Sequence, residues 1–77
     1  MIRLKYDPQA NAAFISLKEI GQGEVATSHV CDYEVEDAAI ILEFDALGRL
    51  LGIEVLGAAK LLSPESLDDA ERPAPTA

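Results

Sequence analysis

The stretch AAIILEFDALGRLLGIEVL, which runs from Ala38 to Leu56, decides the fold of this chain. Two apolar runs, residues 38–44 and 49–56, flank a four-residue segment that ends at Gly48. Glycine adopts at low cost the positive φ angle that a tight hairpin loop requires. The pattern therefore predicts two antiparallel strands, joined by a turn at residues 45–48, as the centre of the domain.

Both predicted strands carry apolar side chains on both faces, because successive residues of a strand point to opposite sides. In the first strand Ile40, Leu42 and Phe44 share one face, and Ile41 lies on the other beside Glu43. In the second strand one face holds Leu51, Ile53 and Val55, and the other holds Leu50, Gly52, Glu54 and Leu56. This apolar surplus predicts that a second copy of the chain covers part of the hairpin.

The residues before this hairpin predict three more strands. Residues 2–6 alternate apolar and basic side chains, which is the period of a strand with one buried face. Pro8 has no N–H group and ends this strand at Asp7. Residues 12–17 and 24–30 follow as the second and third strands, separated by a glycine-containing loop.

After the hairpin, Gly57 breaks the last strand and residues 58–62 predict a short helix. Ser63 and Pro64 then repeat a helix start signal, with serine as the N-cap and proline at the first helical position. The predicted fold class is α+β, a small antiparallel β-meander of about five strands with a short C-terminal helix.

The chain has 77 residues, which allows one small domain. We expect residues 1–68 to form this domain and residues 69–77 to be a flexible, acidic and proline-containing tail. The single cysteine excludes a disulfide framework, which needs cysteines in pairs. A core of this size seldom supplies more than about 3–5 kcal/mol, and oligomerisation is a common remedy. We therefore expect a homodimer or a higher oligomer.

The formal net charge of −8 narrows the classes of partner. Phosphates and anionic lipids repel an acidic surface, so we expect neither nucleic acid nor a membrane as partner, whereas a basic protein would be attracted. The chain contains no run of about 18 apolar residues, so no membrane-spanning helix is predicted, and the N-terminus does not resemble a secretory signal. Together with the unpaired cysteine, these observations predict a cytoplasmic location.

Two motifs in the chain resemble those of a known family. YDPxAxA begins at Tyr6 and precedes an apolar strand, and ILEFDxxGRLxGIEVL begins at Ile41 and forms the hairpin. Together they make residues 1–62 similar to the YuzE-like small bacterial domains of unknown function, Domain of Unknown Function 2283. The resemblance implies a compact domain of meandering strands with a C-terminal helix, and it implies no established activity. It also suggests an antitoxin-like role, the neutralisation of a small basic toxin.

The chain departs from this family's pattern at two positions. Asn11 stands where the family usually has aspartate, and Leu47 stands where a polar turn residue is usual. If the family uses a carboxylate pair at positions 7 and 11, this chain holds only half of it.

Six polar or motif residues are candidates for a functional site: Tyr6, Asp7, Asn11, His29, Asp45 and Glu54. Two interpretations compete for Asp7, Asn11 and Asp45, a carboxylate site at one edge of the sheet or the capping of turns. Capping is favoured, because Asp and Asn side chains accept hydrogen bonds from nearby backbone N–H groups. Glu54 interrupts an apolar strand, either as a site carboxylate or in a cross-strand ion pair with Arg3, Lys5 or Arg49.

His29 and Cys31 are two residues apart, so their side chains point the same way on a strand. A thiol beside an imidazole is the start of a nucleophilic pair, but the acidic neighbours Asp32 and Glu34 disfavour the thiolate. A half-exposed strand end with an inert cysteine is the favoured interpretation. These four residues include one Cys and one His, too few for a closed zinc site within one chain, although a site shared across a dimer axis stays open.

The first functional hypothesis is therefore a small non-catalytic domain that self-associates and binds a protein partner. The second is an antitoxin-like neutraliser of a basic toxin. The third is a small metal-dependent or hydrolytic enzyme that uses His29, Cys31 or the carboxylates. We expect no cofactor, and no catalytic or metal-binding residue is assigned.

Overall fold

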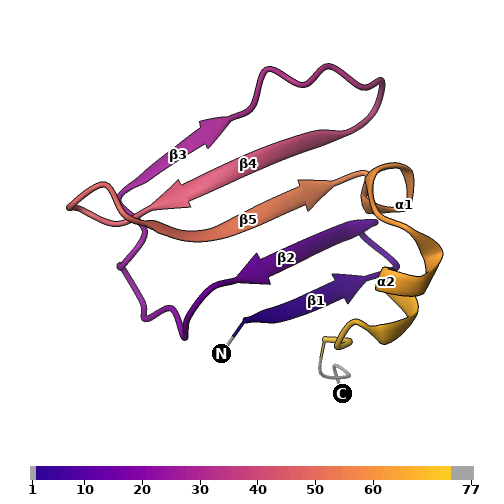
Figure 1. The fold of residues 1–77 in the computed structure, drawn as a ribbon, viewed down its shortest axis with the longest axis horizontal. Helices are drawn as coiled ribbons and strands as arrows, with labels where there is room; N and C mark the ends of the chain where they lie inside the picture. Colours follow the sequence, from indigo (N-terminus) through magenta and orange to yellow (C-terminus); the bar gives the residue numbers. More distant parts are fainter. Residues whose placement is uncertain (1, 74–77) are drawn as a thin grey trace.

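A five-stranded antiparallel sheet with two short helices forms the protein, as the computed structural model shows for residues 2–73 (Figure 1). The strands are β1 (Arg3–Asp7), β2 (Ala12–Ser16), β3 (Thr27–Val30), β4 (Ala39–Phe44) and β5 (Leu50–Leu56). The helices are α1 (Ala58–Leu61) and α2 (Pro64–Asp69). The predicted α+β class is confirmed. No helix within residues 2–73 is long and apolar enough to cross a membrane.

The strand order is β1-β2-β5-β4-β3, and every neighbouring pair is antiparallel. The prediction of a meander therefore needs one correction. Each strand pairs with the next within β1-β2 and within β3-β4-β5, but β2 pairs with β5 and not with β3. The connection at residues 17–26 carries the chain to the far edge of the sheet (Figure 1). The long apolar strand β5 thereby lies in the centre, with a neighbour on each side.

The edge strand β3 begins at Thr27, whereas the sequence predicted a start at Glu24. The reason lies in the side chain of Glu24, which accepts a hydrogen bond from the backbone N–H of Gly21 (2.8 Å) and pairs with Lys18. The backbone N–H of Glu24 also donates to the Gly21 carbonyl (3.2 Å). These bonds hold residues 21–24 in a turn and delay the strand.

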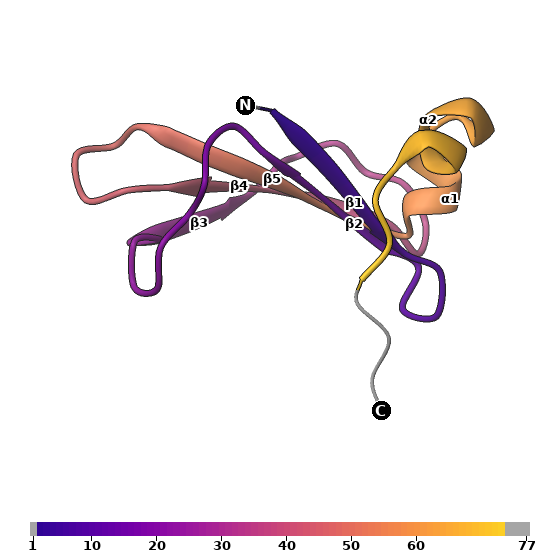
Figure 2. The same cartoon turned by 90° about the horizontal axis from the view of Figure 1, so that it is seen from below.

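Both helices pack on one face of the sheet, which we call the helix face (Figure 2). Ala13 of β2 and Val55 of β5 are buried there against Ala58 and Leu67 of the helices. Partly buried apolar side chains surround this cluster: Leu4, Tyr6, Ile53, Leu61 and Leu62. The opposite face, which we call the open face, carries no helix (Figure 2). The core is therefore small and lies over only part of the sheet.

The chain stays in contact with the sheet after α2. The backbone N–H of Glu71 donates to the Leu4 carbonyl (2.9 Å), and the N–H of Tyr6 donates to the Glu71 carbonyl (2.8 Å). The guanidinium of Arg72 lies 5.1 Å from the centre of the Tyr6 ring. The expected tail boundary at residue 69 thus falls at the end of α2, and ordered contacts continue through Arg72. Residues 74–77 of the expected tail lie outside the described residues.

Gly52 is the position where the sheet tolerates no side chain. A Cβ atom there would lie 2.6 Å from Cζ of Phe14 and 2.8 Å from the Ile15 carbonyl oxygen. We expect Gly52→Ala to lower the free energy of unfolding by about 1–3 kcal/mol, because the added methyl group overpacks this contact. Urea denaturation at fixed protein concentration measures the change.

A second variant separates the two contacts at Gly52. Phe14→Leu in the Gly52→Ala background removes the ring but not the backbone carbonyl, so it restores only part of the stability. An unchanged midpoint for Gly52→Ala alone contradicts the close approach of Phe14.

Candidate functional site

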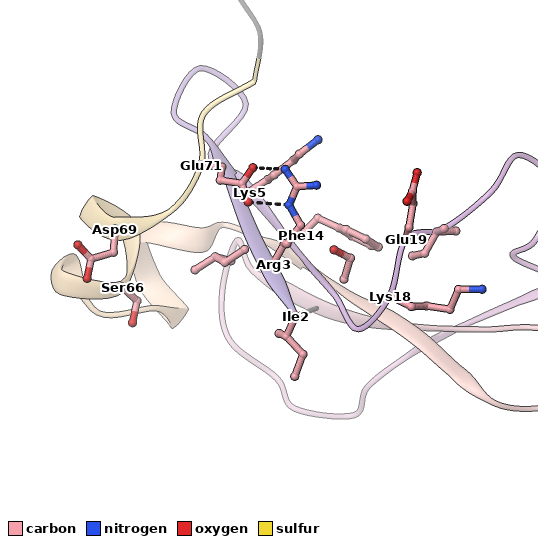
Figure 3. A pocket seen from close by; sticks show the side chains of 12 residues that line it. Ile2, Arg3, Lys5, Phe14, Lys18, Glu19, Ser66, Asp69 and Glu71 are labelled. Atoms are coloured by element: carbon pink, nitrogen blue, oxygen red, sulfur yellow. Dashed lines mark hydrogen bonds and ion pairs between the residues drawn. The ribbon is translucent and has the colours of Figure 1, made fainter.

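A hollow of about 1150 Å³ lies along β1 and β2 (Figure 3). Its lining combines apolar side chains with charged ones of both signs: Ile2, Arg3, Leu4, Lys5, Phe14, Ser16, Lys18, Glu19, Ile20, Ser66, Asp69 and Glu71. Neither histidine nor cysteine is among them. The hollow is therefore a charged groove without a thiol or an imidazole.

Two ion pairs neutralise most of the charge in and beside this groove. Arg3 donates from Nε to Oε2 of Glu71 (2.8 Å) and from Nη2 to Oε1 (2.5 Å), which is the bidentate fork that arginine forms with carboxylates (Figure 3). The hydrogen bond from Arg3 holds the pKa of Glu71 below its usual value. Lys18 pairs with Glu24 and holds the pKa of that carboxyl below its usual value as well. Carboxylates held ionised in this way make poor general acids at neutral pH.

Asp7 and Asp45 use their carboxylates to close turns. Oδ1 of Asp7 accepts a hydrogen bond from the backbone N–H of Gln9 (3.0 Å). Oδ1 of Asp45 accepts from the backbone N–H groups of Leu47 and Arg49 (both 2.9 Å), and Oδ2 accepts from Nε of Arg49 (2.8 Å). The capping interpretation fits both residues, and Gly48 has the positive φ of 80° that the hairpin requires.

Asn11 caps a helix that is distant in the sequence. Its side-chain Oδ1 accepts a hydrogen bond from the backbone N–H of Ala59 (2.9 Å), and its carbonyl accepts from the N–H of Ala58 (3.0 Å). Both N–H groups belong to the first turn of α1, whose N-cap residue Gly57 has no side chain to offer. Asn11 holds a left-handed backbone with φ of 51° to do this. It therefore joins the β1–β2 turn to the helices.

His29 and Cys31 lie at the outer edge of the helix face. The register pairs His29 with Leu42, and the Cys31 N–H donates to the Ile40 carbonyl, so the two residues face the same side of the sheet. His29 is exposed and Cys31 is half-buried. Within residues 2–73 no group of three His, Cys, Asp or Glu side chains is placed to hold a metal ion.

Glu54 lies in the middle of the open face. The register places it between Phe14 of β2 and Ile41 of β4, and it is half-buried. The predicted pairing with Arg3 or Arg49 is wrong, because Arg3 binds Glu71 and Arg49 binds Asp45. No ion pair joins Glu54 to Lys5 in the described part of the chain.

Tyr6 has a structural position, since it contacts the core cluster and carries Arg72 over its ring. The six candidates do not converge on one point. Three of them stabilise turns or a helix start, Tyr6 packs, and His29 and Glu54 lie on opposite faces. Sequence reasoning missed Arg3, Glu71 and Lys60, whose Nζ donates to the Glu36 carbonyl (2.7 Å). The signal available for the first pair was the contrast between basic residues 3–5 and the acidic residues after Pro64.

A family of known proteins has a model that matches most of the chain. The family described as "Protein of unknown function (DUF2283)" has a model that matches residues 3–58. No curated protein and no solved structure matches the chain at a significant level. The match covers both motifs quoted from the sequence and ends at the first residue of α1.

The Asn11 cap can be tested by three substitutions. Asn11→Ala loses the side-chain acceptor, worth about 1 kcal/mol, and forces alanine into a left-handed backbone at about 1–2 kcal/mol more. Asn11→Gly loses only the acceptor, and Asn11→Asp keeps it. We therefore expect thermal stability to fall in the order Asp, Gly, Ala. If the glycine and alanine variants are equally stable, the left-handed conformation of Asn11 is contradicted. If the aspartate variant loses as much stability as the glycine variant, the cap is contradicted.

The Asp45 turn should give the protein part of its acid sensitivity. Hydrogen bonds from the backbone N–H and the side chain of Arg49 hold the pKa of Asp45 below its ordinary value of 3.8. The ionised carboxylate therefore stabilises the fold above that pH, and this contribution is lost as the pH falls through the lowered pKa of the folded state. Glu24 and Glu71 act in the same direction below their ordinary value of 4.5.

We expect Asp45→Asn to be less stable than the wild type at neutral pH, with the difference shrinking as the pH falls below 3.8. Melting temperatures from pH 7 down to about pH 3 measure this. Asp32→Asn, at an exposed residue, removes the same charge and is the control. A pH-independent difference between Asp45→Asn and the wild type contradicts the prediction.

Proposed function

The chain belongs to the DUF2283 family of proteins of unknown function, and from that premise we propose that it is a non-catalytic module that self-associates and binds a protein partner. One observation carries the self-association: β4 reads AIILEF, and none of its six residues is buried. Strands with near-continuous apolar sequence are typical of positions covered on both faces. In the single chain β4 is half-exposed on both, so its sequence fits an assembly better than a monomer.

The helix face offers an apolar surface for a second copy. Ile40 and Leu42 lie on it, as their pairing with Val55 and Ile53 shows, yet neither belongs to the core cluster. We call Ile40 and Leu42 the apolar strip. The open face around β4 is interrupted by Glu43 and Glu54, whose carboxylates are costly to bury unpaired. We therefore place the second copy on the apolar strip.

The non-catalytic assignment has its support in the side-chain chemistry. Asp7, Asn11 and Asp45 each have a side-chain oxygen bonded to backbone N–H groups, and the groove along β1 holds neither thiol nor imidazole. Nucleophilic catalysis needs a nucleophile within hydrogen-bonding reach of a base. Neutralisation of a basic toxin is one special case of partner binding. For the location we propose the cytoplasm, where a reducing environment keeps a free cysteine such as Cys31 in its thiol form.

Light scattering after size exclusion tests the self-association. We expect the wild type to be a dimer at micromolar concentration and Leu42→Glu to be a folded monomer, because two carboxylates would meet across the interface. Leu47→Glu is the matched control, since Leu47 is 77% exposed at the hairpin tip and lies off the strip. The control should remain a dimer.

Leu42→Ala provides a milder test if the glutamate variant fails to fold. Truncation of a central interface residue should weaken the dimer by about fivefold or more. A wild type that stays monomeric at high micromolar concentration, or a Leu42→Glu dimer as tight as the wild type, overturns the proposal.

A further inference from the structure

One edge strand of the sheet, β1, is covered by another segment of the chain, whereas the other edge strand, β3, is exposed. The β1 edge is covered by the protein's own segment around Glu71, whose backbone bonds to Leu4 and Tyr6 and which forms a parallel bridge with Lys5. At the other edge, no described segment lies against the outer side of β3 (Figure 1). An uncovered edge presents free backbone groups to other chains, and natural proteins usually blunt it.

The backbone pattern identifies the free groups on β3. The N–H of Cys31 donates to the Ile40 carbonyl, so in the antiparallel ladder Thr27, His29 and Cys31 turn their backbone groups toward β4. The N–H and C=O groups of Ser28 and Val30 therefore point outward. β3 carries no lysine, proline or glycine, and all four of its residues are exposed, Val30 at 58%. The edge is short but unprotected.

A second hollow, of about 550 Å³, adjoins this edge. It lies between the end of β3 and the connection to β4, and its apolar lining comes mainly from Val30, Tyr33, Val35 and Ala39. The carboxylates Glu34 and Glu36 belong to the same lining. This combination of apolar side chains and carboxylates suits a long basic side chain, because its apolar stem can pack in the hollow while its charge stays near the carboxylates.

We propose that the β3 edge accepts an extended, basic segment of a partner protein as an additional strand, with a Lys or Arg side chain in the adjoining hollow. Strand addition of this kind takes its affinity from main-chain hydrogen bonds and its specificity from neighbouring side-chain sites. The inference names the surface and the chemistry for the partner binding proposed above, and it rests on that proposal. It does not depend on the apolar strip.

The β1 edge is an internal precedent for this mode. There a basic strand, with Arg3 and Lys5, is covered by an extended segment whose Glu71 forms the ion pair with Arg3. At β3 the charges are reversed: the strand is followed by the acidic connection, Asp32 to Asp37. Charge complementarity therefore selects a basic segment, whereas a second copy of this chain is itself acidic, with a net charge of −8.

The test uses acetylated octapeptides in which Lys or Arg alternates with Val, Leu or Tyr, added to the full-length protein. Fluorescence anisotropy measures affinity, and amide hydrogen exchange by NMR locates the site. We expect binding that weakens at high salt, with slowed exchange at Ser28 and Val30. Peptides N-methylated at alternate residues lose the donors along one edge and should bind at least about tenfold more weakly.

Charge-matched variants separate the β3 site from general attraction. Glu34→Lys with Glu36→Lys should weaken peptide binding by at least about tenfold, whereas Glu65→Lys with Asp68→Lys on α2 makes the same charge change and should alter it by about twofold or less. Ser28→Pro removes an outward N–H without touching the ladder, so the fold should survive and binding should be lost.

Three results would each overturn the inference: no binding by any peptide of the set, equal losses in the two double variants, or slowed exchange at amides away from β3. Light scattering on the same samples reports self-association separately. If the protein is a monomer and the peptides still slow exchange at Ser28 and Val30, the dimer is refuted and the β3 site stands. If the protein is a dimer and the peptides bind elsewhere, the dimer stands and the β3 site is refuted.

Discussion

Every layer of this protein depends on β5, which pairs with β2 on one side and with β4 on the other. It joins the β1–β2 hairpin to the β3–β4 pair, and at its end Gly57 turns the chain directly into the helices. Val55 of this strand is the buried centre against which Ala58 and Leu67 pack. The close contact of Phe14 with Gly52 fixes β2 against it on the open face. Without β5 neither half of the sheet has a partner.

The local features of the fold were predictable because nearby residues determine them. Gly48 with Asp45 specifies the hairpin, and Ser63, whose hydroxyl accepts from the Ser66 N–H (3.2 Å), starts α2 with Pro64 as its first residue. The strand order was not predictable in this way. The order depends on which strand pairs with the inner edge of β2. Apolar periodicity indicates which side chains share a face of a strand but not which strands are adjacent. The late start of β3 follows from the Glu24 side chain, whose bond competes with the strand.

The candidate site was predictable only as a set of residue types. Asp7 and Asp45 bond to backbone groups two to four residues away, which short motifs reveal. Asn11 bonds to Ala59, 48 residues further on, and the Arg3–Glu71 fork joins residues 68 apart. Such contacts exist only once the fold has formed, so the sequence shows the opposite charges of the two segments but not which residues pair. What the structure adds is that polar groups here hold elements together rather than gather at one reactive point.

The central place of β5 also has a kinetic consequence. A ribosome makes β1, β2, β3 and β4 before the strand that joins them, so the inner edges of both halves wait unpaired during synthesis. The contacts that complete the sheet span about 40 residues between β2 and β5, and such long-range pairing is slow to form. Neither half can therefore complete the sheet alone, and folding finishes only when β5 pairs with β2 and β4.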